Sequence, residues 1–433
     1  MLDIELFRKN AEVIKFSQKH RGMPEELIDE VCRLDEKWRE YLQQAEKLKH
    51  ERNIVSENIN KLKKAGKPAE IEIKKTKQLV DKLKKVDEEA NTTKMMRDKV
   101  LMEIPNLLDK RVPVGQTDAD NKIIKKWGKI PKLKFKPKDH IDLGQALDLF
   151  EVDKAAKLAG ARFYFLKNEA VILAQAIARY ALDILIRAGY TPITPPNLLH
   201  GKALEWAGYF PGGEEDAYKI ENEDLYLIGT SEQILAAFHA GETLREKDLP
   251  KKYAGYSPCY RTEAGSHGRD TKGIFRVHQF EKVEQIRITT ADASEKAHRE
   301  MIALAEKIFQ GLGIPYRVVI NCTGDIGYAA CAMKYDLEAW LPGQNNYREQ
   351  ASCSNTTDYQ ARRMGTKVLR KNGKTELVHI LNSTAVAVER TMIAIIENGQ
   401  QRDGSIKIPK VLWKYTGFKE IRTEQSSVGQ RKS

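Results

Sequence analysis

The sequence predicts an α+β protein in which an N-terminal antiparallel two-helix coiled coil precedes a larger domain built on antiparallel strands. The helical part is predicted because residues 27–101 contain one proline, one glycine and an apolar repeat, which is typical of a coiled coil. The sheet is predicted because the strand-like segments 254–263 and 274–288 flank a glycine-rich loop, which indicates an antiparallel pair. No G-x-G-x-x-G follows a predicted strand, so nothing supports a parallel, dinucleotide-binding type of core.

Length and composition describe a chain with room for two domains: 433 residues, of which 41% are hydrophobic and 31% charged. No apolar run approaches the roughly 18 residues that span a bilayer, and the alternating charges of the first ten residues do not fit a signal peptide. The five cysteines have no C-x-x-C spacing, which predicts neither a disulfide framework nor a zinc site and favours a reducing, cytoplasmic compartment. The net charge of +12 indicates a polyanionic partner, and composition leaves RNA, DNA and a membrane surface open.

The N-terminal region is predicted to hold a short amphipathic helix within residues 1–23 and then the two long helices. A turn signal at residues 65–68 (AGKP) separates two apolar seams, because a helix should end there. Each long helix is expected to have about 35 residues and to reach roughly 50 Å. The seam consists of Leu27, Val31, Leu34, Trp38, Leu42, Ala45 and Leu48 before the turn and of Leu79, Leu83, Val86 and Ala90 after it.

Positive charge is concentrated around this turn. Residues 61–85 contain ten lysines and three acidic residues, whereas the rest of the helical pair is nearly balanced. A solvated helical face is one interpretation, but a net charge of +7 at one tip favours contact with a phosphate backbone. The candidate phosphate-binding lysines are Lys61, Lys63, Lys64, Lys74, Lys75 and Lys77.

The predicted domains are residues 1–110, which include the helical pair, a basic linker at 111–140 and a C-terminal domain at 141–433. Prolines exclude long helices from the linker. Its lysines alternate with apolar residues towards the end, which predicts a half-buried edge strand.

In the C-terminal domain, apolar periodicity and turn residues predict a series of helices and strands. Residues 371–375 could suggest a P-loop, but Val368 stands where that motif requires a glycine. Asn372-Gly373 is therefore predicted to be a hairpin turn. Residues 382–385 are expected to cap a helix. The predicted order is a helix near 143–150, a helix at 169–187 followed by a strand, a strand at 225–228, a helix at 290–312, strands at 316–320 and 333–340, a strand at 377–381, a helix at 386–398 and a fraying basic tail from residue 407.

The strand pair around residues 260–285 (YRTEAGSHGRDTKGIFRVHQFEKVEQ) is the strongest candidate for a site. Arg261 and Glu263 are expected side by side on one strand, where Arg261 could fork two hydrogen bonds onto a phosphate. The loop cations Arg269 and Lys272 could close over a polyphosphate. An ordinary polar hairpin is the alternative interpretation.

The return strand and two other segments supply further candidate ligands. Phe280 offers a stacking surface, and Glu284 on the same face offers an acceptor for a cationic group. Glu349 and Ser352 offer hard oxygen atoms, which suit Mg²⁺ far better than zinc. Thr230, Ser231 and Glu232 follow a short strand, and they fit either a helix cap or a pocket for a carboxylate.

The 260–285 segment resembles motif 2 of the class II aminoacyl-tRNA synthetases, and its amino-acid sequence is similar to that of the seryl-tRNA synthetases. Further matches follow in the expected order at Thr230, Glu349 and Thr384, so the resemblance covers essentially the whole chain. The helix and strand at 169–196 resemble motif 1, which implies a homodimer. Residues 382–390 resemble motif 3, whose arginine, here Arg390, contacts ATP.

The resemblance implies an antiparallel-sheet class II synthetase core that activates serine with ATP and Mg²⁺, without zinc, and transfers it to the 3′ end of tRNA(Ser), and also of tRNA(Sec). The N-terminal helical pair would hold the long variable arm of that tRNA. The implied serine-binding residues are Thr230, Ser231, Glu232, Arg261, Glu284, Asn382 and Thr384. The implied ATP-binding residues are Arg261, Thr262, Glu263, Val277, Phe280, Glu349, Gln350, Ala351, Ser352 and Arg390, with Mg²⁺ at Glu349 and Ser352.

Individual roles also follow from the resemblance. Arg261 and Arg390 are the implied catalytic residues, with Arg261 on the α-phosphate and the serine carboxylate and Arg390 above an adenine that stacks on Phe280. Glu263 would read the adenine amino group. Glu284 and Glu232 would hold the ammonium group of serine, and Thr384 its hydroxyl.

One departure from the family pattern and two rival functions remain. Gln350 and Ala351 stand where the family usually has valine or isoleucine followed by serine, which favours a backbone role for them. One rival is a synthetase-like ligase that charges a carrier protein, although such relatives lack the long helical arm. The other is a non-enzymatic coiled-coil RNA-binding protein on a degenerate core.

Overall fold

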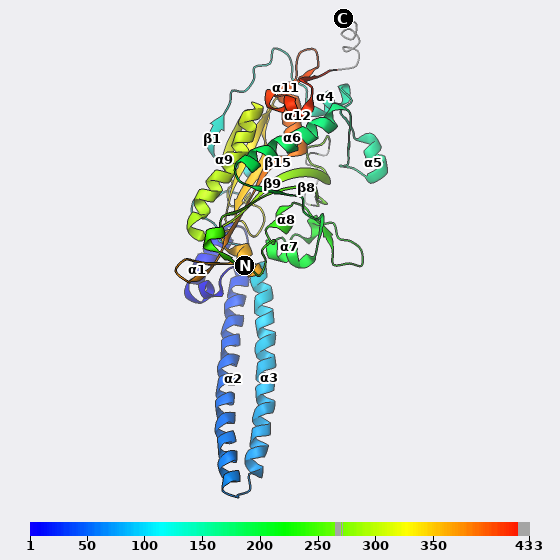
Figure 1. Cartoon of the computed structure of the whole chain (residues 1–433). Helices are drawn as coiled ribbons and strands as arrows, with labels where there is room; N and C mark the ends of the chain where they lie inside the picture. Colours follow the sequence, from blue (N-terminus) through cyan, green and yellow to red (C-terminus); the bar gives the residue numbers. More distant parts are fainter. Residues whose placement is uncertain (265–269, 271, 423–433) are drawn as a thin grey trace. The chain divides into compact units, whose positions relative to one another are not determined.

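The computed structural model describes residues 1–264, 270 and 272–422, and it divides the chain into two compact units, Met1–Leu107 and Leu108–Ser433 (Figure 1). The first unit is helical and the second contains all the strands. Within the described residues, no helix is long and apolar enough to cross a membrane.

The first unit confirms the predicted helical pair. The short helix α1 (Ile4–His20) is followed by two long antiparallel helices, α2 (Glu26–Lys64) and α3 (Glu70–Glu103) (Figure 1). The turn between them contains Gly66 at φ +67°, which glycine adopts without strain. The six lysines predicted to bind phosphate are all exposed around this turn. The buried seam consists of Ile28, Val31, Leu34, Ala45 and Val55 on α2 and of Leu79, Leu83, Ala90 and Leu101 on α3.

A buried carboxylate fixes the base of the helical pair. Asp35 on α2 accepts hydrogen bonds from Arg8 on α1 at 2.7 and 2.9 Å and from Arg97 on α3 at 2.7 Å. Burial raises the pKa of Asp35, but the two arginines outweigh that effect and lower it. Because the charge is compensated, this cluster ties all three helices together where the long pair begins.

The second unit is built on an eight-stranded sheet. Its strands pair antiparallel throughout, except that the outermost strand β4 runs parallel to β8. In spatial order the strands are β1 (Lys122–Trp127), β10 (Tyr316–Ile320), β11 (Met333–Leu341), β12 (Asn346–Asn355), β15 (His379–Ala387), β9 (Gln279–Thr289), β8 (Lys251–Tyr260) and β4 (Thr191–Ile193).

One face of the sheet carries the main hydrophobic core. Three long helices pack there: α6 (Glu169–Arg187), α9 (Ser294–Leu312) and α11 (Val388–Gly399). Side chains alternate along a strand, so the opposite face receives polar residues. Asp336 lies opposite Ser352 on β11 and β12, and Thr384 lies opposite Glu284 on β15 and β9.

Smaller elements surround this core. The short helices are α4 (His140–Ala146), α5 (Asp153–Ala159), α7 (Gly201–Ala207), α8 (Glu232–Leu235), α10 (Tyr359–Met364) and α12 (Trp413–Thr416). The short strands are β2 (Phe150–Glu151) paired with β3 (Phe165–Leu166), β5 (Leu198–Leu199) with β6 (Tyr226–Leu227), β7 (Thr243–Arg245) with β13 (Lys367–Leu369) and β14 (Thr375–Leu377), and β16 (Ile406–Lys407) with β17 (Glu420–Ile421).

The structure confirms the hairpin turn at Asn372-Gly373, where Gly373 has φ +80°. It corrects two strand boundaries. Strand β8 ends at Tyr260, so Arg261 and Glu263 follow the strand instead of lying on it, and Glu263 has φ +54°. Strand β9 begins at Gln279, five residues later than predicted. Between the two strands, Arg261, Glu263 and residues 274–277 line a pocket instead of continuing the strand pair.

Two other predictions were wrong. Residues 382–385 do not cap a helix, because β15 continues to Ala387 and α11 begins at Val388. The edge strand of the linker is β1, whereas the alternating lysines at 132–138 have no regular structure. The basic tail from residue 407 is folded as far as Ile421 through β16, α12 and β17. Its predicted fraying at residues 426–430 falls within 423–433, which lie outside the described part of the chain, as does Arg269.

Candidate active site

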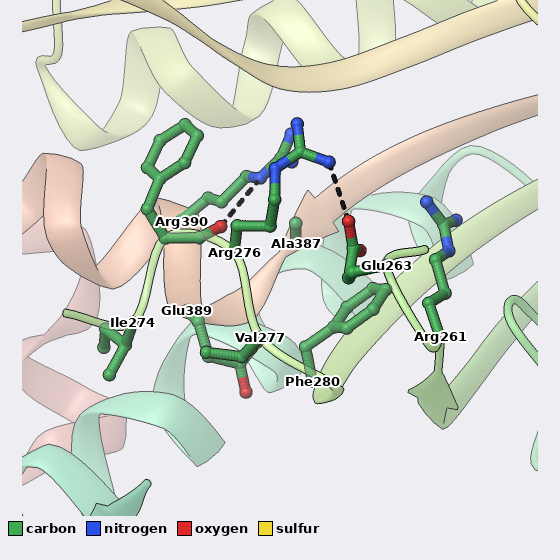
Figure 2. Close-up of a pocket in the computed structure, with 10 residues that line it drawn as sticks. Arg261, Glu263, Ile274, Arg276, Val277, Phe280, Ala387, Glu389 and Arg390 are labelled. Carbon is green, nitrogen blue, oxygen red and sulfur yellow. Dashed lines mark hydrogen bonds and ion pairs between the residues drawn. The ribbon is translucent and has the colours of Figure 1, made fainter. Parts of the chain in front are cut away.

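A pocket opens where β8 ends and β9 begins, beside the junction of β15 and α11 (Figure 2). Since β9 lies between β8 and β15 in the sheet, residues more than a hundred positions apart meet in it. The lining residues are Arg261, Glu263, Ile274, Phe275, Arg276, Val277, Phe280, Ala387, Glu389 and Arg390.

Arg261 lies at the mouth of this pocket. Its guanidinium carbon is 5.3 Å from the ring centroid of Phe280, and its Nε donates a hydrogen bond to the Gly229 carbonyl at 3.2 Å. Its two terminal nitrogens donate no hydrogen bond to any described residue. The side chain is therefore held by its stem while the fork remains available for an anion.

Glu263 does not lie beside Arg261 in the way the sequence predicted. Arg276 Nη1 donates to Glu263 Oε2 at 2.7 Å across the pocket (Figure 2). Arg276 was not identified from the sequence, because the strand assumed there would have hidden the pairing. Thr262 points away, and its hydroxyl donates to the Glu215 carbonyl outside the pocket.

Arg390 lies over Phe275, 4.8 Å from the ring centroid, and not over Phe280. Its Nη1 is 3.3 Å from Glu349 Oε2 and also donates to the Glu349 carbonyl at 3.3 Å. Arg348, the residue before Glu349, lies 4.0 Å from the centroid of the same Phe275 ring. Two guanidinium groups thus converge on one wall of the pocket.

A β-bulge brings Glu349 to the polar face of the sheet. The register between β11 and β12 shifts at Gln350, so Glu349 lies opposite Glu338 while Ala351 lies opposite Leu337. In a regular strand Glu349 and Ser352, three positions apart, would point to opposite faces, and the bulge lets them share one face. Gln350 and Ala351 are themselves buried.

The charges around Glu349 favour its ionised form. Burial raises its pKa, but the nearby Arg390 and Lys334 outweigh burial and lower the pKa. Asp336, which is 3.5 Å from Lys334 Nζ, is affected in the opposite direction, because burial raises its pKa. Among the described residues no group of three or more His, Cys, Asp or Glu side chains is placed to hold a metal ion.

A second buried carboxylate is surrounded by donors. Glu232 accepts hydrogen bonds from the hydroxyls of Tyr209 at 2.9 Å and Tyr328 at 2.8 Å, and from Gln360 Nε2 at 3.2 Å. The two tyrosine rings stack with centroids 5.1 Å apart. These three partners were missed because Tyr209 follows α7, Tyr328 lies in a loop and Gln360 lies on α10, and none of these segments carries a motif.

Burial and the neighbouring carboxylate of Glu284 raise the pKa of Glu232 to about 7, although both tyrosine donors act to lower it. The N-terminal residues of α8 are also buried. Thr230 Oγ1 accepts from the Glu232 backbone N–H at 3.3 Å. The N-cap of α8 is Ser231, which makes no side-chain capping hydrogen bond, and its Oγ has no partner among the described residues. The structure thus places these residues at the start of α8, and their role in a pocket stays a prediction.

Glu284 lies on the same polar face, and it is 98% buried. Thr384 Oγ1 donates to Glu284 Oε2 at 3.0 Å, and Lys282 Nζ lies 2.8 Å from the same oxygen. Asn382, two residues before Thr384 on β15, donates to the Tyr328 hydroxyl at 2.8 Å and so links this group to Glu232. The face thus places two buried carboxylates, Glu232 and Glu284, in one hydrogen-bonded group.

Comparison with known proteins gives a consistent result over the whole length. Residues 217–399 match the family model of the tRNA synthetase class II core domain (G, H, P, S and T), and residues 1–108 match that of the seryl-tRNA synthetase N-terminal domain. The serine–tRNA ligases of Pyrococcus abyssi and Thermococcus kodakarensis are each 47% identical to it, over 97% of both chains.

Two solved structures are similar throughout. The crystal structure of seryl-tRNA synthetase from Pyrococcus horikoshii complexed with ATP has a TM-score of 0.95 and 45% identity, and covers 98% of this chain and 100% of its own. The cytoplasmic serine–tRNA ligase from Naegleria fowleri in complex with AMP has a TM-score of 0.90 and 36% identity, and covers 98% of this chain and 99% of its own.

Proposed function

This chain belongs to the seryl-tRNA synthetase family, whose members are class II serine–tRNA ligases, and we propose how its residues divide the two steps of that reaction. In the first step the serine carboxylate attacks the α-phosphate of ATP and pyrophosphate leaves. In the second the seryl group passes to a terminal ribose hydroxyl of tRNA. The assignment rests on two groups in the second unit. One is the pocket that Arg261 lines with its two terminal nitrogens unengaged, and the other is the pair of buried carboxylates Glu232 and Glu284.

On the ATP side, Arg261 holds the α-phosphate and the serine carboxylate, and it stabilises the charge that grows as they react. Phe280 stacks on the adenine, and Glu263 accepts from the adenine amino group. Arg390 faces the phosphates rather than the Phe280 ring, which its position over Phe275 supports. The remaining contacts come from the backbones of Thr262, Val277, Gln350 and Ala351.

Glu349 and Ser352 are the residues that would hold Mg²⁺. The bulge turns both side chains to one face, and the low pKa of Glu349 keeps that carboxylate ionised. Two protein oxygens, one of them from a carboxylate, are a ligand set that would suit Mg²⁺. When bound, the ion neutralises phosphate charge, while Arg261 and Arg390 orient the phosphates.

On the serine side, Glu232 and Glu284 hold the ammonium group, with Thr230, Ser231 and Asn382 completing the pocket. Thr384 accepts from the serine hydroxyl, because its own proton is already donated to Glu284. A pocket that hydrogen-bonds this hydroxyl rejects alanine, since its own polar groups then lack a partner.

Replacing Thr384 with alanine is expected to narrow the discrimination between serine and alanine by about 0.5–1.5 kcal/mol, the value of one neutral hydrogen bond. Part of the loss should be common to both amino acids, because Thr384 also donates to Glu284. Exchange kinetics with serine, threonine and alanine separate the two parts. Equal weakening of serine and alanine would mean that Thr384 acts only by holding Glu284.

Serine binding is expected to weaken below about pH 7, where Glu232 becomes protonated because its pKa is raised to about 7. An ionised Glu232 attracts the ammonium group, so kcat/KM for serine should rise through this pH and then level off. Tyr328→Phe removes a donor that favours the ionised form and should shift the rise to higher pH. A pH profile of serine-dependent exchange measures both midpoints, and an unchanged midpoint in the variant would contradict the role given to Glu232.

The partners follow the same logic. We propose that tRNA(Ser), and also tRNA(Sec), is held by the six lysines at the turn between α2 and α3.

A homodimer would form on α6 and β4, where Val171, Ile172 and Ile186 are 38–44% exposed. Five free cysteines fit a reducing cytoplasm. Sedimentation of the full chain tests the dimer.

The experiment that tests the function is serine-dependent exchange of pyrophosphate into ATP, followed by charging of tRNA(Ser). Exchange with serine and charging of the tRNA support the proposed division of roles. Exchange without tRNA charging would favour a ligase that acts on a carrier protein. A chain that binds RNA without any exchange would favour the non-enzymatic alternative.

A further inference from the structure

The segment that joins β1 to α4 carries charge that none of the roles above uses. Residues 122–138 contain eight lysines and no aspartate or glutamate. All eight are exposed. We call this row the lysine strip; its members are Lys122, Lys125, Lys126, Lys129, Lys132, Lys134, Lys136 and Lys138.

The strip is attached to the second unit along its length. Its first part is β1, the edge strand of the sheet, which pairs with β10. Its second part, residues 128–139, has no helix or strand and runs as an extended trace to α4 (Figure 1). There Leu133 and Phe135 are half-buried and alternate with the exposed lysines. Neighbouring side chains of an extended chain point to opposite sides, so the apolar residues hold the segment while the lysines face outward.

The charge of the strip is almost uncompensated. Lys125 Nζ lies 2.6 Å from Glu306 Oε2, and no other lysine of the strip forms an ion pair with a described residue. A surface that only meets water usually mixes both signs of charge. A row of lysines without acidic partners repels itself, so it favours a polyanionic partner.

The strip ends at the rim of the ATP pocket. The Lys138 backbone exchanges two hydrogen bonds with the Gln400 side chain, at 2.9 and 3.0 Å. Two residues further on, His140 packs so tightly on Gly273 that a Cβ there would lie 2.3 Å from His140 Nε2. Gly273 directly precedes residues 274–277, which line the pocket.

We propose that the lysine strip is a second RNA-binding surface, which holds the phosphate backbone of the tRNA next to its 3′ end. The proposal rests on the proposed function, because transfer requires the terminal ribose to enter the pocket at which the strip ends. Lysines contact phosphates as point charges and read no base. The strip therefore contributes affinity and orientation near the reacting end, independently of the lysines between α2 and α3.

The test compares two variants of the full chain with equal change in charge. The strip variant carries Lys132→Gln, Lys134→Gln, Lys136→Gln and Lys138→Gln. The control carries four substitutions at exposed lysines elsewhere on the same unit, none in an ion pair with a described residue: Lys247→Gln, Lys307→Gln, Lys371→Gln and Lys374→Gln. The probes are a tRNA(Ser) transcript and a short RNA hairpin that reproduces only its acceptor arm.

The strip variant should bind both RNAs about 10- to 100-fold more weakly than the unmodified chain, and the slope of log Kd against log salt should fall by about 2–3. The control should stay within about twofold, with an unchanged slope. Serine-dependent exchange should be the same in all three proteins, because no lysine of the strip lines the ATP pocket.

Several outcomes would overturn the proposal. Equal weakening in both variants would mean that only net charge matters, and no weakening would mean that the strip faces water. Unchanged binding of the acceptor hairpin would place the strip on another part of the tRNA.

Loss of exchange in the strip variant would mean that the substitutions disturb the pocket. Binding to anionic vesicles but not to RNA, if it depends on the strip, would assign the surface to a membrane. Absence of exchange in the unmodified chain would instead refute the proposed function, while the direct RNA-binding comparison would still decide the strip.

Discussion

Replacing Arg261 with alanine is expected to slow seryl-adenylate formation by about 10²–10³-fold, the usual effect of removing one preorganised group that stabilises developing charge. Arg261 is the residue for which the structure makes this expectation sharpest. Its stem is fixed by Gly229 and Phe280, and its two terminal nitrogens are not engaged by any described residue. Little reorganisation is needed before it meets the α-phosphate.

Arg261→Lys is the matched control, because it keeps the charge but not the fork. It should recover part of the rate, since a lysine cannot bridge the phosphate and the serine carboxylate in the same way. The loss should appear in kcat more than in the KM for ATP. Thermal unfolding of both variants checks the fold. An exchange rate within about threefold of the unmodified chain would remove Arg261 from the catalytic step, because the expected loss is far larger.

Sequence periodicity predicted the long elements correctly. The apolar pattern places several elements close to their observed positions: α2, α3, α6, α9, β10 and β11. Such elements are long enough for their own pattern to outweigh neighbouring signals. The resemblance to the class II synthetases, rather than periodicity, predicted that Arg261, Phe280, Glu349 and Arg390 share a site. In the structure each of them follows or lies in a strand of the same sheet.

The errors occurred where local signals contradict the tertiary structure. Asn382 and Thr384 have the small, polar character of a helix cap. They nevertheless lie on a central strand, because β12 pairs with β15 as far as Ser383 and β9 pairs with it as far as Ala387. Glu263 would follow the alternation of a strand, but its positive φ turns it towards Arg276. A bulge such as that at Gln350 has no sequence signature of its own, although it decides which face Glu349 occupies.

The donors around Glu232 mark a different limit. Tyr209, Tyr328 and Gln360 come from three separate segments, and no spacing relates them. Only the folded sheet and the elements that cover it bring them to one carboxylate. A single sequence can identify a buried glutamate near a helix start, but it cannot identify the groups that keep that glutamate partly ionised.

Shortening the helical pair is expected to lower tRNA charging by at least about 10²-fold while serine-dependent exchange persists. The design removes residues 49–85 and joins Leu48 to Val86 through the native turn sequence of residues 65–69. It keeps the cluster of Asp35, Arg8 and Arg97 that ties the three helices together. The register set by Asp35 and Arg97 places the two cut ends at the same height along the antiparallel pair.

The expected size follows from the contacts that are lost. All six lysines proposed to hold the tRNA lie in the removed part, and two charge-assisted hydrogen bonds to phosphate at about 1.5 kcal/mol each already correspond to roughly 10²-fold in affinity. Every residue proposed to contact ATP or serine lies after residue 225, so activation should be retained.

A full-length variant with the same six lysines changed to glutamine separates charge from length. If both variants lose charging and keep exchange, the lysines at the turn carry the tRNA contact. If only the shortened chain loses charging, the helices act through their length or their apolar surface, such as Ile71, which is 81% exposed. If the shortened variant charges tRNA within about threefold of the unmodified chain, the proposed role of the arm is contradicted. Loss of six phosphate-binding lysines should weaken tRNA binding much more than that.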